Sequence, residues 1–329
     1  MEKIVIGIDI SAKTLDICVK RIGKKEFLKI ENSVVKIRTF FKRFLKYQQV
    51  IVSMENTGKY NWFLYEVLEE FNFKVFVINP LHLKKSLGLV RGKNDVVDAE
   101  RIADFTDKNQ EMLHEWKPDS DEMKKLKVLF SERNSKTKLK ANLLKLQHNY
   151  KLTKSGCEKT LLKMNRQEVE LLEKHILTLE KEIEAVIKSS ESLYQKAKLI
   201  KSVPGVGKVL CWILLVKTNA FEAIIEPRKL ACYAGVVPFD HQSGTSIRYK
   251  SKVSYYADKS LKSILHMAAM SAIRLENDLK DYYQRKVTQG KNKMLVLNNV
   301  RNKIIHRVFA VIKQQKPYEK KYKNSLVLS

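Results

Sequence analysis

The chain has 329 residues, a length at which two domains are expected, and 63 Lys and Arg against 36 Asp and Glu leave a net charge of +27. Because so large an excess makes a folded chain repel itself, it indicates a polyanionic partner, namely nucleic acid, rather than a merely basic protein. No apolar run is long enough to span a bilayer, no signal peptide opens the chain, and the four Cys have no paired spacing, which predicts no membrane partner and buried thiols in a reducing cytoplasm.

The first predicted element is a strand at residues 4–10, a short β-branched run that carries one charge, Asp9. A second apolar strand at 50–54 runs directly into Glu55. A carboxylate in such a place is costly unless it is paired, metal-bound or at the solvent end of the strand. Taken alone, each is more simply interpreted as a capping or turn residue.

A third acidic segment favours a metal site over capping residues. Residues 93–100 lead into a helical pattern that puts Asp95 and Asp98 on one helix face, three residues apart. Hard carboxylate ligands, with no Cys or clustered His beside them, suit Mg²⁺ or Mn²⁺, and converging carboxylates are what two-metal phosphoryl transfer requires. The sequence therefore predicts a metal site formed by Asp9, Glu55, Asp95 and Asp98.

The elements between these acids predict the first fold. Three strands joined as hairpins are followed by helix and strand in alternation, the order of a ribonuclease-H-like α/β domain over residues 1–118. The further strands are expected at 14–20, 26–30 and 75–78, and the helices at 34–44 and 60–71.

Residues 119–198 are predicted to be a helical connector. Ser120 can cap a long helix whose Lys run indicates a nucleic-acid face, although a charge run is usually only a solvated face; the proposed contacts are Lys136, Lys138, Lys140 and Lys145. From Val169 to Val186, apolar residues then repeat every three or four positions as a heptad seam. This predicts a coiled coil or an antiparallel helical hairpin, with self-association favoured.

Residues 199–329 are predicted to be a mainly α-helical C-terminal domain. Gly205, Gly207 and Lys208 form a helix-hairpin-helix-like loop that lets the backbone approach a phosphate, with an ordinary Pro-Gly turn as an equal alternative. A polar loop at 240–246 contains Ser243, and basic residues follow it, namely Arg248, Lys250 and Lys252. A helix is expected at 261–275 and a loose or nucleic-acid-bound basic tail at 313–323.

Taken together, these motifs resemble the DEDD transposases of insertion-sequence family one-hundred-and-ten, which are relatives of the pilin-gene invertases and bridge-RNA-guided recombinases. Residues 7–9, 54–58 and 93–99 look like the family's four acids on a RuvC-like domain, and 203–207 and 233–238 look like its second domain. Ser243-Gly244 occupies the place of the family's nucleophilic serine. The family commonly has Lys-Gly-Arg and then Lys-x-Gly-Asn after that serine, whereas this chain has 250–252 as Lys-Ser-Lys and 256–258 as Tyr-Ala-Asp.

The resemblance implies a DNA recombinase of the bacterial cytoplasm, associated with the nucleoid, that excises and inserts its own element. It implies that a non-coding bridge RNA pairs with donor and target DNA, that Ser243 forms a phosphoserine–DNA intermediate, and that a dimer or tetramer assembles the site from two protomers. Two alternatives stay open. One is a junction-resolvase-like nuclease that uses the acids and water without the serine. The other is a non-catalytic RNA-binding component in which the acids are structural caps.

Overall fold

The structure is a computed structural model that describes residues 3–86, 95–152, 156–237, 239–243 and 247–319. Within these ranges, only the backbone is described for residues 59, 84–86, 95–96, 239–243 and 247–252. The chain divides into two compact units, Met1–Pro118 and Asp119–Ser329, each with its own core. Within the described ranges, no helix has the length and apolar character needed to cross a membrane.

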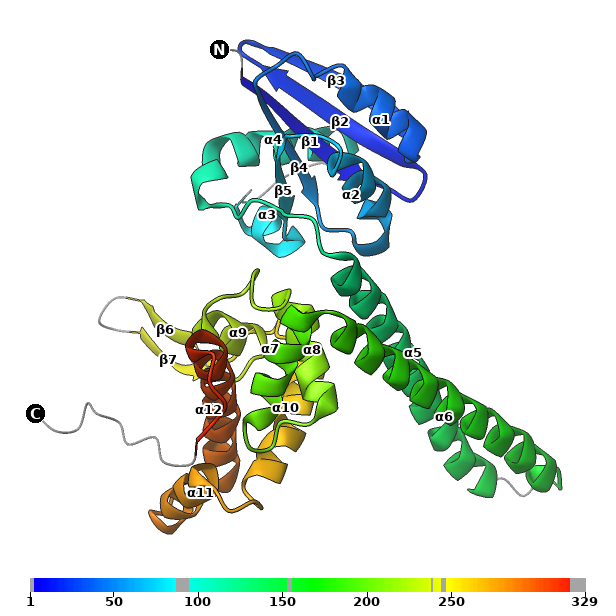
Figure 1. The fold of residues 1–329 in the computed structure, drawn as a ribbon, viewed down its shortest axis with the longest axis vertical. Helices are drawn as coiled ribbons and strands as arrows, with labels where there is room; N and C mark the ends of the chain where they lie inside the picture. Colours follow the sequence, from blue (N-terminus) through cyan, green and yellow to red (C-terminus); the bar gives the residue numbers. More distant parts are fainter. Residues whose placement is uncertain (1–2, 87–94, 153–155, 238, 244–246, 320–329) are drawn as a thin grey trace, which may run out of the picture. The chain divides into compact units, whose positions relative to one another are not determined.

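The first unit is built on a mixed five-stranded sheet with the order β3-β2-β1-β4-β5 (Figure 1). The first three strands are antiparallel, whereas β4 and β5 run parallel to the central strand β1. The strands are β1 (Lys3–Ile10), β2 (Thr14–Arg21), β3 (Lys24–Glu31), β4 (Gln49–Glu55) and β5 (Lys74–Ile78). The predicted order, three hairpin strands followed by helix and strand in alternation, is therefore confirmed, and it forms a mixed sheet with β1 in its centre.

Helices cover both faces of this sheet, because alternate residues of β1 and β4 are apolar on each side. On one face, Ile6 and Ile8 pack in a core with α1 (Val34–Lys42) and α2 (Trp62–Leu68). On the other face, Val5 packs with α4 (Asp95–Asn109). The short elements are η1 (Gly58–Asn61), α3 (Pro80–Ser86) and η2 (Gln110–Met112). The unit closes where Trp116 stacks on Tyr65, with ring centroids 4.9 Å apart.

The second unit begins with two long helices, α5 (Asp121–Leu152) and α6 (Glu158–Ser189), which pack as an antiparallel pair (Figure 1). Ser120 Oγ accepts a hydrogen bond from Met123 N–H at 3.2 Å, as expected for the predicted cap. Val169 and Ile183 of the heptad seam are buried inside this pair. The seam is thus used within the chain, and the hairpin alternative is correct; the heptad pattern does not require a second copy.

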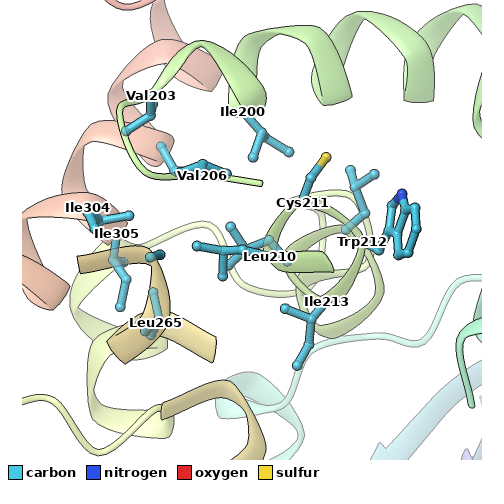
Figure 2. Packing of buried hydrophobic residues seen from close by; sticks show 14 of the residues in the cluster. Ile200, Val203, Val206, Leu210, Cys211, Trp212, Ile213, Leu265, Ile304 and Ile305 are labelled. Atoms are coloured by element: carbon cyan, nitrogen blue, oxygen red, sulfur yellow. The ribbon is translucent and has the colours of Figure 1, made fainter. Parts of the chain in front are cut away.

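The remaining helices gather around α8 (Lys208–Thr218), an almost wholly apolar helix whose Trp212 is fully buried. Figure 2 shows α8 residues meeting side chains from α7, α10 and α12. The other helices are α7 (Glu191–Ser202), α9 (Pro227–Tyr233), α10 (Lys259–Ala272), α11 (Asp278–Thr288) and α12 (Lys293–Gln314). The mainly helical C-terminal part is therefore confirmed.

Three expectations are corrected. Residues 240–243 are not loop but part of β6 (Phe239–Ser243), which pairs with β7 (Ile247–Lys252). The expected tail starts inside a helix, because α12 continues to Gln314; residues 320–323 lie outside the described range. Cys18 and Cys211 are buried, with burial raising the pKa of their thiols to about 11 and about 12, but Cys157 is exposed and Cys232 is only half-buried.

Candidate active site

Asp9 and Glu55 lie at the ends of neighbouring parallel strands. The register pairs Ile8 of β1 with Met54 of β4, so that the two acids follow on adjacent strands at the same edge of the sheet. Ile8 and Met54 face the α1–α2 core, and because side chains alternate along a strand, Asp9 and Glu55 face the α4 side. Asp9 Oδ1 also accepts a hydrogen bond from the Ile10 N–H at 3.0 Å.

Gly7 lets α4 lie close over this face. A Cβ at Gly7 would be 2.3 Å from the Ala99 carbonyl oxygen and 2.4 Å from the Ala103 nitrogen, so only glycine fits here. Asp9 is the next residue on the same face of β1, and Asp98 directly precedes Ala99 at the beginning of α4. The close approach at Gly7 therefore brings the N-terminal turn of α4 to the sheet edge that carries Asp9 and Glu55.

Ion pairs fix the position of α4 along the sheet. Lys3 bonds to Asp107 at 2.7 Å and Lys20 to Asp104 at 2.7 Å, so that α4 runs antiparallel to β1. Hydrogen bonds from Lys20 and Lys3 hold the pKa of Asp107 below its ordinary value, which keeps it ionised at neutral pH. These pairs position the first turn of α4 without using the acids of the candidate site.

The donor chemistry of the site fits a hard divalent cation. Asp9 and Glu55 are partly exposed, and Asp98 has an exposed side-chain fraction of 28% and bonds to Arg101 Nη1 at 2.7 Å. Asp95 is the first residue of α4, but its side chain is not among those described. Among the described side chains, no three carboxylate, Cys or His groups lie close enough together to form a metal site.

Sequence reasoning missed two asparagines that shape the loops after these strands. Asn61 is fully buried, donates to the Glu55 carbonyl at 3.0 Å and accepts from the Thr57 N–H at 2.9 Å. Asn32 donates to the carbonyls of Ser11 and Tyr60, at 3.0 and 3.2 Å, and so joins the loops that follow β1 and β4. No spacing in the sequence signals these contacts, because they depend on the strand order.

Asp16 is a further carboxylate that the sequence reasoning missed. It is the cross-strand partner of Asp9 in β2, and its side chain is only 7% exposed. Lys29 on β3 bonds to it at 3.1 Å and balances its charge. Asp16 therefore lies beside Asp9 with a cation of its own; its position between Leu15 and Ile17, in the apolar part of the strand, was a usable signal.

In the second unit, Ser243 is the last residue of β6 and pairs with Ile247 of β7. Arg248, Lys250 and Lys252 occupy alternate positions of β7. The side chains of these residues, and all of Gly244 and Ser246, are outside the described part of the structure. The structure thus places the backbone of the predicted serine at the end of a β-hairpin strand.

The base of this hairpin is firmly braced. Asp258 N–H donates to the Tyr233 carbonyl at 2.8 Å, and Lys217 Nζ bonds to Asp258 Oδ2 at 2.9 Å. Burial pushes the pKa of Lys217 down, but the contact with Asp258 outweighs it and leaves the pKa raised. Asn298 of α12 donates to the Val236 carbonyl at 2.8 Å, which fixes the chain just before β6.

The two glycines of the loop between α7 and α8 have different surroundings. Gly205 has a φ of +83°, and a Cβ there would lie 2.3 Å from the Ala268 carbonyl oxygen of α10. Gly207 has open space around it, and both Gly207 and Lys208 are exposed at the start of α8. Packing against α10 is therefore sufficient reason for Gly205, whereas Gly207 and Lys208 remain available to a ligand.

The four lysines of α5 also fall into two pairs, one that is ion-paired and one that is exposed. Lys136 bonds to Glu132 at 3.1 Å, and Lys140 bonds across the hairpin to Glu173 at 2.8 Å. Lys138 and Lys145 are exposed and lie seven residues apart, two turns along one helix face. Of the predicted set, Lys138 and Lys145 present their charge to solvent.

Comparison with known proteins matches both units. A transposase model of the DEDD type from IS110 elements matches residues 6–150, and a model described as the Transposase IS116/IS110/IS902 family matches residues 197–284. The pilin gene-inverting protein of Moraxella lacunata is 27% identical over 334 residues, covering 98% of this chain and 99% of that protein. A 43.6 kDa protein of the insertion element IS110 from Streptomyces coelicolor is 26% identical over 137 residues, covering 42% of this chain and 34% of that protein.

Among solved structures, one described as T. thermophilus RuvC in complex with Holliday junction substrate matches 35% of this chain and 99% of its own, with 17% identity and a TM-score of 0.29. That TM-score is too low to add to the strand order described above. The two family models are the stronger finding, because they match successive parts of the chain and together cover well over half of it. This chain belongs to the IS110 family of DEDD transposases and is a DNA transposase or recombinase.

Proposed function

We propose that the chain is an RNA-guided recombinase that excises and inserts its own insertion sequence through a phosphoserine–DNA intermediate. The observation that carries the proposal is the backbone position of three acids in the first unit: adjacent strands end at Asp9 and Glu55, and Gly7 lets the α4 turn that bears Asp98 approach the same edge of the sheet. Capping alone does not account for acids from three separate segments near one edge of the sheet.

The acids would hold Mg²⁺ or Mn²⁺ through Asp9, Glu55, Asp95 and Asp98 on a RuvC-like domain. When bound, such an ion stabilises negative charge on a phosphate undergoing displacement. Asp16, whose charge Lys29 balances, would not occupy a ligand position. The other residues of the site serve to hold these carboxylates in place.

Ser243 would attack the phosphodiester through its hydroxyl oxygen. The serine hydroxyl gives up its proton as its oxygen forms a P–O bond, the P–O bond to the departing strand breaks, and the departing oxygen takes up a proton, so that no net proton is gained or lost; the ester keeps the bond energy for rejoining. Arg248, Lys250 and Lys252, on the strand that pairs with that of Ser243, would neutralise the DNA being cut. A dimer or tetramer would supply acids and serine from different protomers.

A non-coding RNA from the element would select donor and target DNA by base pairing, while the protein reads shape and backbone. The net charge of +27 supports several nucleic-acid strands being bound at once. We expect one abundant RNA, encoded next to the gene in its element, to co-purify with the chain and to be identified by sequencing. Co-purification of a random sample of cellular RNA would contradict the proposal that an RNA guides the recombinase.

Charge on α5 allows a second test. Lys138→Gln with Lys145→Gln is expected to weaken binding of DNA and RNA and to reduce the slope of log K against log salt by about two, roughly one for each lost phosphate contact. The matched pair Lys136→Gln with Lys140→Gln should change that slope less, because these lysines already bond to Glu132 and Glu173. Equal slopes in both double variants and the wild type, measured by salt titration, would mean that the α5 lysines form only a solvated face.

A further inference from the structure

Two consecutive tyrosines project from the segment between β7 and α10. Tyr255 is 85% exposed and Tyr256 is 61% exposed. Their rings meet edge to face, with centroids 5.8 Å apart and planes at 86°. Lys259 Nζ lies over the ring of Tyr255, 5.8 Å from its centroid. Two adjacent aromatic rings that leave so much surface to water, with a cation beside them, have the composition of a base-stacking surface.

The backbone under these rings is held in place by several bonds. Tyr256 N–H donates to Ser254 Oγ at 3.2 Å, and Ala257 N–H donates to the Ser254 carbonyl at 3.3 Å. Asp258 then caps α10 by accepting from the Leu261 N–H at 2.9 Å. On the other side, a Cβ on Gly235 would lie only 2.5 Å from the Ala257 Cβ. Because the turn is braced in this way, binding a ligand would cost little ordering of the chain.

The charges near the rings favour a phosphodiester. Lys252 precedes the segment and Lys259 and Lys262 follow it. The acid between them, Asp258, is paired with Lys217 at 2.9 Å. A strand with a phosphate at Lys259, whose Nζ lies over the Tyr255 ring, would bring a base to the tyrosine rings.

We propose that Tyr255 and Tyr256 form a stacking site for an unpaired nucleobase of the bound nucleic acid. This rests on the proposed recombination function, because strand exchange exposes unpaired nucleotides, and it adds a contact that neither the acids nor Ser243 makes. Tyr255 follows the end of β7 opposite to the end that pairs with Ser243, and β7 has six residues, about 20 Å at ~3.3 Å per residue. The stacked base therefore belongs to a nucleotide several positions away from the phosphate that Ser243 attacks.

The test uses the full chain in EDTA, where no cleavage occurs, with single-stranded DNA and RNA oligonucleotides of one sequence that carry 2-aminopurine, and with a blunt DNA duplex. We expect 2-aminopurine fluorescence to be quenched on binding to the wild type. Tyr255→Ala should lose this quenching and bind single strands on the order of tenfold more weakly, whereas Tyr255→Phe should keep both properties, because stacking needs the ring and not the hydroxyl. Tyr194→Ala, which removes a 41% exposed tyrosine from α7, is the matched control and should behave as the wild type.

The proposal would be overturned if Tyr255→Ala kept the affinity and the quenching of the wild type, or if Tyr255→Phe lost as much affinity as Tyr255→Ala. It would also be overturned if Tyr255→Ala lost as much affinity for the blunt duplex as for single strands. A fall in the sedimentation mass of Tyr255→Ala would overturn it as well, because the rings would then hold two protein copies together. The DNA and RNA arms tell which strand supplies the base. Since the readout needs no cleavage, a chain that forms no covalent adduct but shows Tyr255-dependent quenching would refute the phosphoserine step and leave the stacking site in place.

Discussion

Asp9→Asn is expected to abolish strand cleavage and recombination while the chain still folds and binds RNA. Asparagine has nearly the shape of aspartate and can still accept the hydrogen bond from the Ile10 N–H, now 3.0 Å long. It lacks the negative charge that a divalent cation requires at the edge of the sheet. We expect the rate to fall by on the order of 10³-fold or more, because charge stabilisation at a reacting phosphate is lost.

The measurement is a recombination assay with donor DNA, target DNA and the co-purified RNA in the presence of Mg²⁺. Glu26→Gln is the matched control: it removes a carboxylate from β3 of the same sheet, one that bonds to Arg43 at 3.2 Å and lies outside the proposed metal site. It should recombine at nearly the wild-type rate. If Asp9→Asn recombines as fast as the wild type, the assignment of the metal site is wrong.

Ser243→Ala is expected to lose recombination altogether, by roughly 10⁴-fold or more, because removal of an attacking hydroxyl leaves no other group to form the ester. The change deletes one oxygen, so the variant should fold and bind RNA and DNA as the wild type does. The nucleic-acid contacts proposed for Arg248 and Lys250 are unchanged in it. A filter-binding assay and a recombination assay on the same preparation separate these two effects.

Ser246→Ala is the control, since this serine lies three residues further along the same segment. It should remain active. Activity in Ser243→Ala together with its loss in Ser246→Ala would show that the wrong serine was chosen. Normal cutting by both variants would mean that water is the nucleophile, and the junction-resolvase-like nuclease would then be the better account.

The first unit was predictable because its strands other than β3 bury apolar residues and because each strand ends at a turn signal. The run at 4–10 is too apolar and too β-branched to be anything but a central strand, and the structure puts it there. What the sequence could not supply was register. Only the pairing of Ile8 with Met54 brings Asp9 beside Glu55, and only the pairing of β1 with β2 puts Asp16 opposite Asp9.

The second unit was less predictable for three reasons. A heptad seam has the same pattern whether its partner is in the same chain or in a second copy, so the pairing of α5 with α6 could not be derived from Val169 to Val186. Residues 240–243 are polar and rich in turn-forming types, which hides a strand whose pairing is made by the backbone. By contrast, α12 had a usable signal in apolar residues four apart, at Val296, Val300 and Ile304, all of them buried.

The most direct test of the recombination chemistry is to trap the reaction of the wild-type chain with end-labelled DNA under denaturing conditions and to map any attached peptide by mass spectrometry. The account predicts DNA covalently bound to the protein, resistant to denaturant and removed by protease, with the phosphate on Ser243. Cleaved DNA with free ends and no attached protein, formed at the wild-type rate, would contradict it.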